Sequence, residues 1–92
     1  MGWIRLNGAG LTEREAAMDQ LGTSLGLPDW WGRNLDALHD CLTDGSFCLA
    51  LENCGLLEAS PFGRRLLRVL TEAAGENPNL KVEMLGEIAQ KD

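Results

Sequence analysis

Residues 47–51, with the sequence FCLAL, form a nearly uninterrupted apolar run, and this run constrains the fold more than any other part of the chain. A strand with one face in water alternates apolar and polar residues, whereas a strand covered on both faces does not. We therefore expect a central strand here, covered on both faces. A chain of 92 residues has room for one core, which predicts a single domain over residues 1–92. So small a core needs its large apolar side chains inside, so Trp3 and Trp31 are expected to be buried.

The signals on either side of this run favour a parallel α/β fold. Strands are predicted at residues 3–6, closed by the turn residues Asn7-Gly8, and at residues 80–85. Helices are predicted at residues 13–25, from Asn34 to the break at Gly45-Ser46, and from Ser60 to Gly75, with a helical turn at 54–59. Parallel strands need a crossover helix between them, and this order supplies one. The polar residues 87–92 are expected to fray.

Three local signals predict where the helices begin. Thr12 followed by Glu15 fits a capping box at the start of the first helix. Asn34 is placed to cap the short second helix. Ser60-Pro61 is typical of an N-cap followed by proline at the first helical position.

Charge and composition exclude several function classes. The net charge of −6 argues against nucleic acid as a partner, because such binding needs clustered Lys and Arg. Only Arg64, Arg65 and Arg68 are grouped, and their spacing is that of a solvated helix face. The first residues resemble no secretory signal and no apolar run could span a bilayer, so a cytoplasmic location and no membrane partner are expected. Three cysteines without a CxxC pair are expected to be reduced and buried: Cys41, Cys48 and Cys54.

Residues 27–43, LPDWWGRNLDALHDCLT, carry the strongest functional signal. At about 100° per residue, the predicted helix separates an apolar side from a polar side. No Lys or Arg occurs between Asn34 and Gly63, although exposed helices usually balance their carboxylates with cations at i+4 spacing. The pattern indicates a surface kept for an external cation. The apolar side consists of Leu35, Leu38, Cys41 and Leu42, and the polar side of Asp36, His39, Asp40, Thr43 and Asp44.

The same segment, followed by an apolar strand, closely resembles the core motif of the barstar family, the intracellular inhibitors of secreted microbial ribonucleases. Its loop aromatics, turn glycine, capping Asn and acidic helix occur together at a fixed spacing. The rest of the chain is similar in element order, length and acidity, from WIRLNG at residues 3–8 to the helix around residues 66–73. The resemblance implies an α/β fold with a three-stranded parallel sheet and flanking helices. It also implies that the short helix and its preceding loop enter the ribonuclease active site, so that the protein blocks catalysis and performs none.

Carried over position by position, the resemblance assigns partner-binding roles to this segment and to one acidic residue further on. Asp40 corresponds to the carboxylate that takes the place of the RNA phosphate and meets the arginines and catalytic histidine of the enzyme. Asp36 is its neighbour on the same face, and Trp30 corresponds to the aromatic that packs on that histidine. The surrounding contacts correspond to the backbone of Gly32 and Asn34, to Leu35, His39 and Thr43, and to Glu72 on the last long helix.

The chemistry of Asp40 supports this role without the resemblance. A site that binds a phosphodiester displays guanidinium and imidazolium donors to an anion, and a carboxylate fits that arrangement bidentately. An acidic inhibitor and a basic nuclease also attract one another at long range, which raises the association rate and makes it sensitive to salt. Together with this chemistry, the resemblance implies a 1:1 complex with a basic, guanyl-specific microbial ribonuclease. The free chain is expected to be a monomer that needs no cofactor and no metal.

Three departures from the family pattern alter the expected interface. His39 stands where a family member carries Trp, so a smaller, titratable side chain replaces apolar contact area. The segment Asp44-Gly45-Ser46 is shorter and lacks the aromatic expected there. Trp30-Trp31 replace two tyrosines, which keeps the aromatic area but removes the hydroxyl groups. A related but different ribonuclease is therefore an alternative partner.

Other interpretations of the same residues stay open. On most small acidic proteins, Asp36 and Asp40 would form an ordinary solvated face. With His39 they lie at i, i+3 and i+4, a spacing that could hold a divalent metal in a small metal-dependent enzyme. A cysteine nucleophile is not favoured, because His39 and Cys41 at i and i+2 point apart. A barstar-like scaffold could also bind another basic toxin or nuclease.

Overall fold

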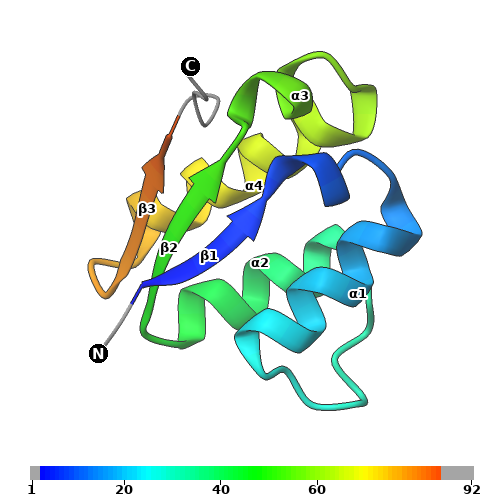
Figure 1. Cartoon of the computed structure of the whole chain (residues 1–92). Coiled ribbons are helices and arrows are strands. Elements are labelled where there is room, and N and C mark those ends of the chain that lie inside the picture. Colours follow the sequence, from blue (N-terminus) through cyan, green and yellow to red (C-terminus); the bar gives the residue numbers. More distant parts are fainter. Residues whose placement is uncertain (1–2, 86–92) are drawn as a thin grey trace.

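Figure 1 shows the computed structural model of the chain, which describes residues 3–85. The sheet consists of β1 (Ile4–Asn7), β2 (Phe47–Glu52) and β3 (Leu80–Met84). Its strands are parallel in the order β1-β2-β3, with Leu6 opposite Leu51 and Leu49 opposite Val82. The predicted α/β fold, with its three-stranded parallel sheet and its central strand at residues 47–51, is confirmed. The bounds of each strand differ from the predicted ranges by one residue.

The helical segments follow the predicted order along the chain. Within residues 3–85 they are the 3-10 helix η1 (Gly8–Gly10) and the α-helices α1 (Arg14–Leu25), α2 (Leu35–Asp44), α3 (Cys54–Glu58) and α4 (Pro61–Glu76). The predicted turn at Asn7-Gly8 is the beginning of η1. The side-chain oxygen of Asn7 starts this short helix by accepting a hydrogen bond from the backbone N–H of Ala9 at 2.9 Å.

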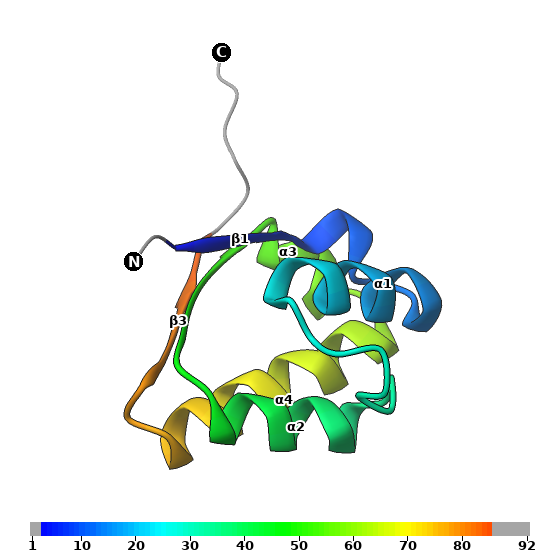
Figure 2. The same cartoon turned by 90° about the horizontal axis from the view of Figure 1, so that it is seen from below.

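The helices lie together on one face of the sheet (Figure 2). The order of the strands in the sheet follows their order in the chain, so the two crossovers step across the sheet in the same direction. Right-handed crossovers that step the same way place their helices on the same side. Leu49 and Leu51 of β2 therefore point into the helical layer and are fully buried. Of the two faces of β2 that were predicted to be covered, helices therefore cover one (Figure 2).

The open face of the sheet explains why β2 is apolar throughout. Ala50 points to this face, yet it is buried. Its partners in the strand register are Arg5 and Glu83, whose long side chains flank it. Arg5 also pairs with Glu52, with 3.6 Å between Nε and Oε2. Ala50 can therefore be apolar and buried on this face although no helix within residues 3–85 covers it.

The core lies between the sheet and the helices and consists mainly of leucine. Trp31 is buried in it, as predicted. Trp3 is 49% exposed, contrary to the prediction, because alternation along β1 turns Ile4 and Leu6 toward the helices and Trp3 toward the open face. The largest fully buried side chains are Leu6, Leu11, Met18, Leu21, Leu38, Leu42, Leu49, Leu51, Leu57, Leu66 and Leu70.

Two of the three predicted helix caps are confirmed. The side chains of Asn34 and Ser60 each accept a hydrogen bond from a backbone N–H three residues on, at 2.7 and 3.2 Å. The capping box at Thr12 is wrong, because the N-cap residue of α1 is Glu13 and its side chain makes no capping bond. The carbonyl of Thr12 instead accepts a hydrogen bond from the Ser60 hydroxyl at 2.9 Å. Ser60 therefore caps α4 and also links α4 to the start of α1.

Three further expectations concern the chain as a whole. The tail at residues 87–92 lies outside the described residues. Across residues 3–85, no helix has the length and apolarity needed to cross a membrane. Cys41, Cys48 and Cys54 are free thiols, of which Cys54 is buried and the other two are half-buried. Burial raises the pKa of the Cys54 thiol, whose Sγ donates to the carbonyl of Leu51 at 3.2 Å.

Candidate partner-binding site

The loop between α1 and α2 separates its two tryptophans. Gly26 ends α1 with a left-handed φ of 66°, and two further left-handed residues, Gly32 at 94° and Arg33 at 52°, precede α2. Between these turns, Trp31 packs against α1 and is buried. Trp30, in contrast, is 84% exposed. The loop is thus anchored by one indole and presents the other to solvent.

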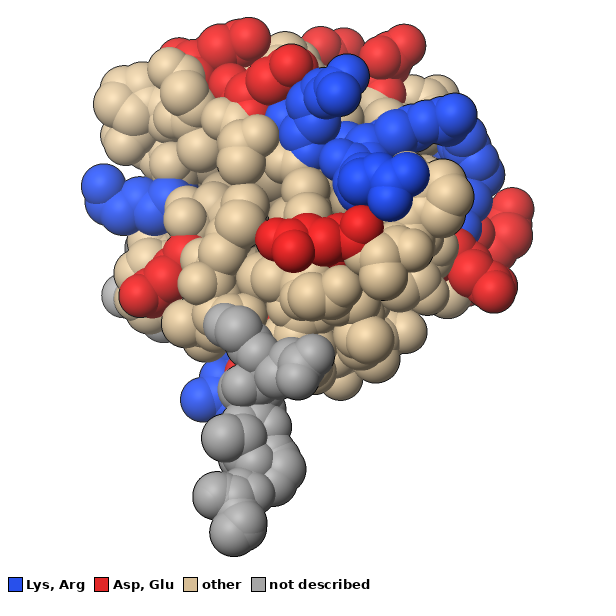
Figure 3. All heavy atoms as spheres, turned by 90° about the horizontal axis from the view of Figure 1, so that it is seen from above, with Lys and Arg blue, Asp and Glu red and all other residues tan. Residues whose placement is uncertain are grey.

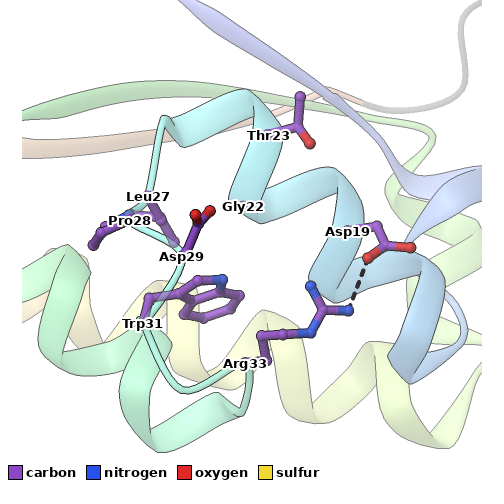
Figure 4. Close-up of a pocket in the computed structure, with 8 residues that line it drawn as sticks. All are labelled: Asp19, Gly22, Thr23, Leu27, Pro28, Asp29, Trp31 and Arg33. Atoms are coloured by element: carbon purple, nitrogen blue, oxygen red, sulfur yellow. Dashed lines mark hydrogen bonds and ion pairs between the residues drawn. The ribbon is translucent and has the colours of Figure 1, made fainter.

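Arg33 ties this loop to α1. Its Nη2 lies 2.8 Å from Oδ1 of Asp19 and 3.6 Å from Oε1 of Glu15, and Figure 4 shows the contact with Asp19. The hydrogen bond to Asp19, followed by the charges of both carboxylates, raises the pKa of Arg33. The last cation before α2 in the sequence is therefore engaged by α1.

Gly32 is predicted to stabilise the loop because other residues would be strained at its position. A side chain there would be strained by the φ of 94°, and its Cβ would lie 2.9 Å from the Cβ of Ala37. We expect Gly32→Ala to lower the free energy of unfolding by about 1–2 kcal/mol, measured by urea denaturation. Gly75→Ala is the control. Gly75 lies within α4 and an added Cβ would meet open space, so this substitution should slightly stabilise the protein. Equal stability of Gly32→Ala and the wild type would contradict the strain.

The helix α2 has the two sides that the sequence predicts. Leu38 and Leu42 are fully buried against the rest of the core. Asp36, Asp40 and Asp44 are exposed, spaced one turn apart along the helix. Three like charges at this spacing repel one another, so α2 presents a line of negative charge to solvent.

Asp40 is highly exposed and has no strong charge partner among the residues that the structure describes. Its side chain is 88% exposed, and its ion contact is with Nδ1 of His39 at 4.0 Å. The face drawn in Figure 3 shows Lys and Arg gathered beside acidic side chains, whereas α2 contains neither residue type. Within the described part of the chain, the ion pairs formed by Arg5 and Arg33 are with other carboxylates, those of Glu15, Asp19 and Glu52. Asp40 therefore has no Lys or Arg partner among residues 3–85.

His39 is turned toward α4 rather than outward with the carboxylates. It is half-buried, and its Nε2 lies 3.3 Å from Oε1 of Glu76. Glu72 is exposed on α4, one turn before Glu76 and on the same side of that helix. The contact between His39 and Glu76 thus joins α2 to α4 and places Glu72 along the edge that adjoins α2.

The other predicted contact residues are more enclosed or act through the backbone. Leu35 and Thr43 are half-buried, and the Thr43 hydroxyl donates to the carbonyl of His39 at 3.0 Å within α2. Gly32 and Asn34 are exposed, and the side-chain nitrogen of Asn34 donates to the carbonyl of Gly32 at 3.2 Å. Asn34 therefore stiffens the last turn of the loop while capping α2.

Trp30 and Asp40 line one groove between the loop and α2. The groove has a volume of about 360 Å³. Its apolar part comes from the loop and from one thiol, and its carboxylates come from α2. We call it the Trp30 groove, and its lining residues are Leu27, Pro28, Trp30, Asp40, Cys41, Asp44 and Gly45. An exposed indole beside carboxylates suits a ligand with both apolar and cationic parts.

Asn77 holds the far end of α2 in place, and the sequence did not indicate this. The residue is buried at the end of α4, and its Nδ2 donates to the carbonyls of Leu42 at 2.9 Å and Gly45 at 2.8 Å. The last carbonyls of a helix need donors from outside the helix. The sequence hid the need for a donor, because Gly45 after Asp44 is typical of a helix end, whereas in the structure its φ of −111° forms no left-handed cap. The donor lies 35 and 32 residues away from its acceptors.

The alternative metal site gains no support from the geometry. Within residues 3–85, no three His, Cys, Asp or Glu side chains lie where they could together hold a metal ion. His39 is drawn toward Glu76, away from a shared site with Asp36 and Asp40. The arrangement instead favours recognition of a cationic surface.

Residues 1–85 match the family described as barstar (barnase inhibitor). A protein of Bacillus subtilis (strain 168), YrdF, named provisionally as a ribonuclease inhibitor, is 43% identical over 53 residues. That alignment covers 54% of this chain and 58% of YrdF, so the chain spans little more than half the length of this relative.

Proposed function

The chain belongs to the barstar (barnase inhibitor) family, and from this membership we propose that it inhibits a secreted, guanyl-specific microbial ribonuclease. In this proposal, α2 and the loop at residues 26–34 plug the active site of the enzyme. The inhibitor acts in the cytoplasm of the bacterial cell that makes the enzyme, binds it 1:1 and catalyses nothing itself. The provisional name of YrdF supports the same function.

The observation that carries the proposal is the exposed carboxylate of Asp40 without a Lys or Arg partner among residues 3–85. A carboxylate held by an internal arginine would be unavailable to an enzyme. An open carboxylate on an exposed helix face can instead accept hydrogen bonds from the guanidinium and imidazolium groups that bind the phosphate of RNA. Asp40 is thus the proposed mimic of that phosphate.

Trp30 is the proposed apolar anchor beside Asp40. An indole that is 84% exposed is a large apolar surface for the free protein to leave in water. Tryptophan is among the residues that most often dominate protein interfaces. The full set of proposed contacts is Trp30, Gly32, Asn34, Leu35, Asp36, His39, Asp40, Thr43 and Glu72.

The orientation of His39 favours an enzyme related to, but different from, the reference ribonuclease of this family. Its imidazole contacts Glu76 of α4 and offers little apolar area outward. A partner that expects a large aromatic at this position would lose contact area there. In the alternative proposal, another basic toxin or nuclease binds to the same acidic surface.

A panel of purified ribonucleases and other basic nucleases tests the proposal. Each enzyme is titrated with the protein while RNA or DNA cleavage is measured. We expect activity of a guanyl-specific microbial ribonuclease to fall linearly and to reach zero at one inhibitor per enzyme. If the protein inhibits only a different nuclease, that nuclease is its partner and the guanyl-specific ribonuclease is not. No inhibition of any enzyme, or cleavage by the protein itself that a chelator abolishes, would contradict the proposal.

The association rate should be steeply dependent on salt. The inhibitor carries a net charge of −6, and its partner is expected to be basic. We expect the rate constant, measured by stopped-flow fluorescence, to fall at least about tenfold as ionic strength rises from about 0.01 M to about 0.5 M. This magnitude is inherited from barnase and barstar, the reference example of such steering. An association rate that does not change with salt would contradict electrostatic attraction.

A further inference from the structure

We propose that Asp44 is a second partner-binding carboxylate, and that with Trp30 and Asp40 it makes the Trp30 groove a receptor for one arginine side chain of the partner. The inference rests on the proposed function, because it names the group that the inhibited enzyme inserts. Neither the family resemblance nor the set of proposed contacts includes Asp44. Three features of the groove support it: its geometry, its field and the position of Asp44 on the helix.

The geometry of the groove fits a guanidinium group. Asp40 and Asp44 both line the groove and lie one helical turn apart, which puts their Cβ atoms about 5–6 Å from each other. Trp30 lines it from the loop, with its indole exposed. A planar guanidinium has five N–H donors, so it can bridge two carboxylates while stacking on an indole. Leu27 and Pro28 offer apolar surface to the methylene groups of the arginine.

The field inside the groove is negative. Burial raises the pKa of the Cys41 thiol, and the charges of Asp40 and Asp44 raise it further. Both carboxylates therefore act on one point in the wall of the groove. A cation entering there is attracted by both.

Asp44 does not stabilise α2, so helix stability does not explain why an aspartate occupies this position. It is the last residue of α2, where the helix dipole disfavours a negative charge, and it lies four residues after Asp40, which repels it. Within the described part of the chain, no Lys or Arg pairs with it. Residues that lower stability are commonly kept for function. A cation from a partner would remove the repulsion along this face.

The test compares two nearly isosteric variants that each remove one negative charge. Asp44→Asn removes the carboxylate from the groove, and Glu83→Gln removes one from the opposite, open face of the sheet. We expect Asp44→Asn to raise the inhibition constant about tenfold or more, and to raise the melting temperature by about 2–4 °C. Glu83→Gln should change the inhibition constant less than about threefold, through its effect on net charge alone.

The arginine is identified by replacing the arginines in the cleft of the inhibited enzyme with alanine, one at a time. We expect one such enzyme variant to bind wild-type inhibitor and Asp44→Asn equally well. The inference is overturned if no arginine behaves this way, or if Asp44→Asn inhibits as well as Glu83→Gln. In those cases a large effect of Asp40→Ala would leave the proposed function intact. Absence of inhibition by the wild type would overturn both.

Discussion

Asp40→Ala is expected to weaken inhibition of the ribonuclease more than any other single substitution. Truncating one partner of a buried, hydrogen-bonded charge pair in a complex costs about 2–5 kcal/mol, which corresponds to an increase of roughly 30-fold or more in the dissociation constant. Much of this cost arises in the enzyme, whose phosphate-binding groups would be buried without an anion. The magnitude follows the reference pair of the family, barnase and barstar, in which an aspartate dominates the interface. The measurement is the inhibition constant at fixed salt.

The same substitution should leave the free inhibitor folded. The side chain of Asp40 is 88% exposed, and its loss removes repulsion from the carboxylates one turn away on α2. The melting temperature should therefore stay the same or rise slightly. Glu13→Ala is the control, since Glu13 is exposed and its side chain makes no capping bond, and it should inhibit like the wild type. If both variants inhibit equally well, the role given to Asp40 is wrong.

Asn77→Ala is expected to have the largest effect on stability. The substitution removes the Asn77 side-chain amide, which donates one hydrogen bond to the carbonyl of Leu42 and one to that of Gly45 at the end of α2. Losing these bonds and leaving enclosed acceptors unpaired should cost about 2–4 kcal/mol. In a domain of this size, that lowers the melting temperature by roughly 10 °C or more. Inhibition should weaken as well, because Asp40 and Asp44 lie on the turns that lose their anchor.

Asn79→Ala is the matched control for this prediction. Asn79 lies two residues further on and is exposed, and it joins the same turn through its backbone, whose N–H donates to the side chain of Asn77 at 2.9 Å. Its side chain is not the donor to α2, so the melting temperature should change by less than about 3 °C. Thermal unfolding followed by circular dichroism measures both variants. Similar melting temperatures for the two would show that Asn77 does not anchor α2.

The sequence predicted those parts of the fold that depend on local signals. The caps at Asn34 and Ser60, the helical spacing of leucines in α2 and α4, and the central position of residues 47–51 follow from residues close together in the chain. The prediction that β2 is covered on both faces left open what covers it, because the apolar signal has two explanations. Ala50 is shielded by side chains of neighbouring strands, and nothing within residues 47–51 distinguishes this from cover by helices.

The candidate site was predictable in its composition and less so in its geometry. Helical periodicity placed the carboxylates of α2 on an exposed side, and the structure agrees for Asp36, Asp40 and Asp44. It could not indicate that His39 turns to Glu76 or that Asn77 supports the helix, because both contacts join segments more than 30 residues apart. The roles of the predicted contact residues stay predictions that the variants above test.

The claim that Asp40 occupies the position of the RNA phosphate is tested most directly by competition with inorganic phosphate at constant ionic strength. The dissociation constant of the wild-type inhibitor should rise in proportion to phosphate concentration, because both occupy one anion site. Asp40→Ala leaves that site empty in the complex, so its dissociation constant should not rise with phosphate. If phosphate affects the two proteins equally, or has no effect on the wild type, Asp40 does not take the place of the phosphate.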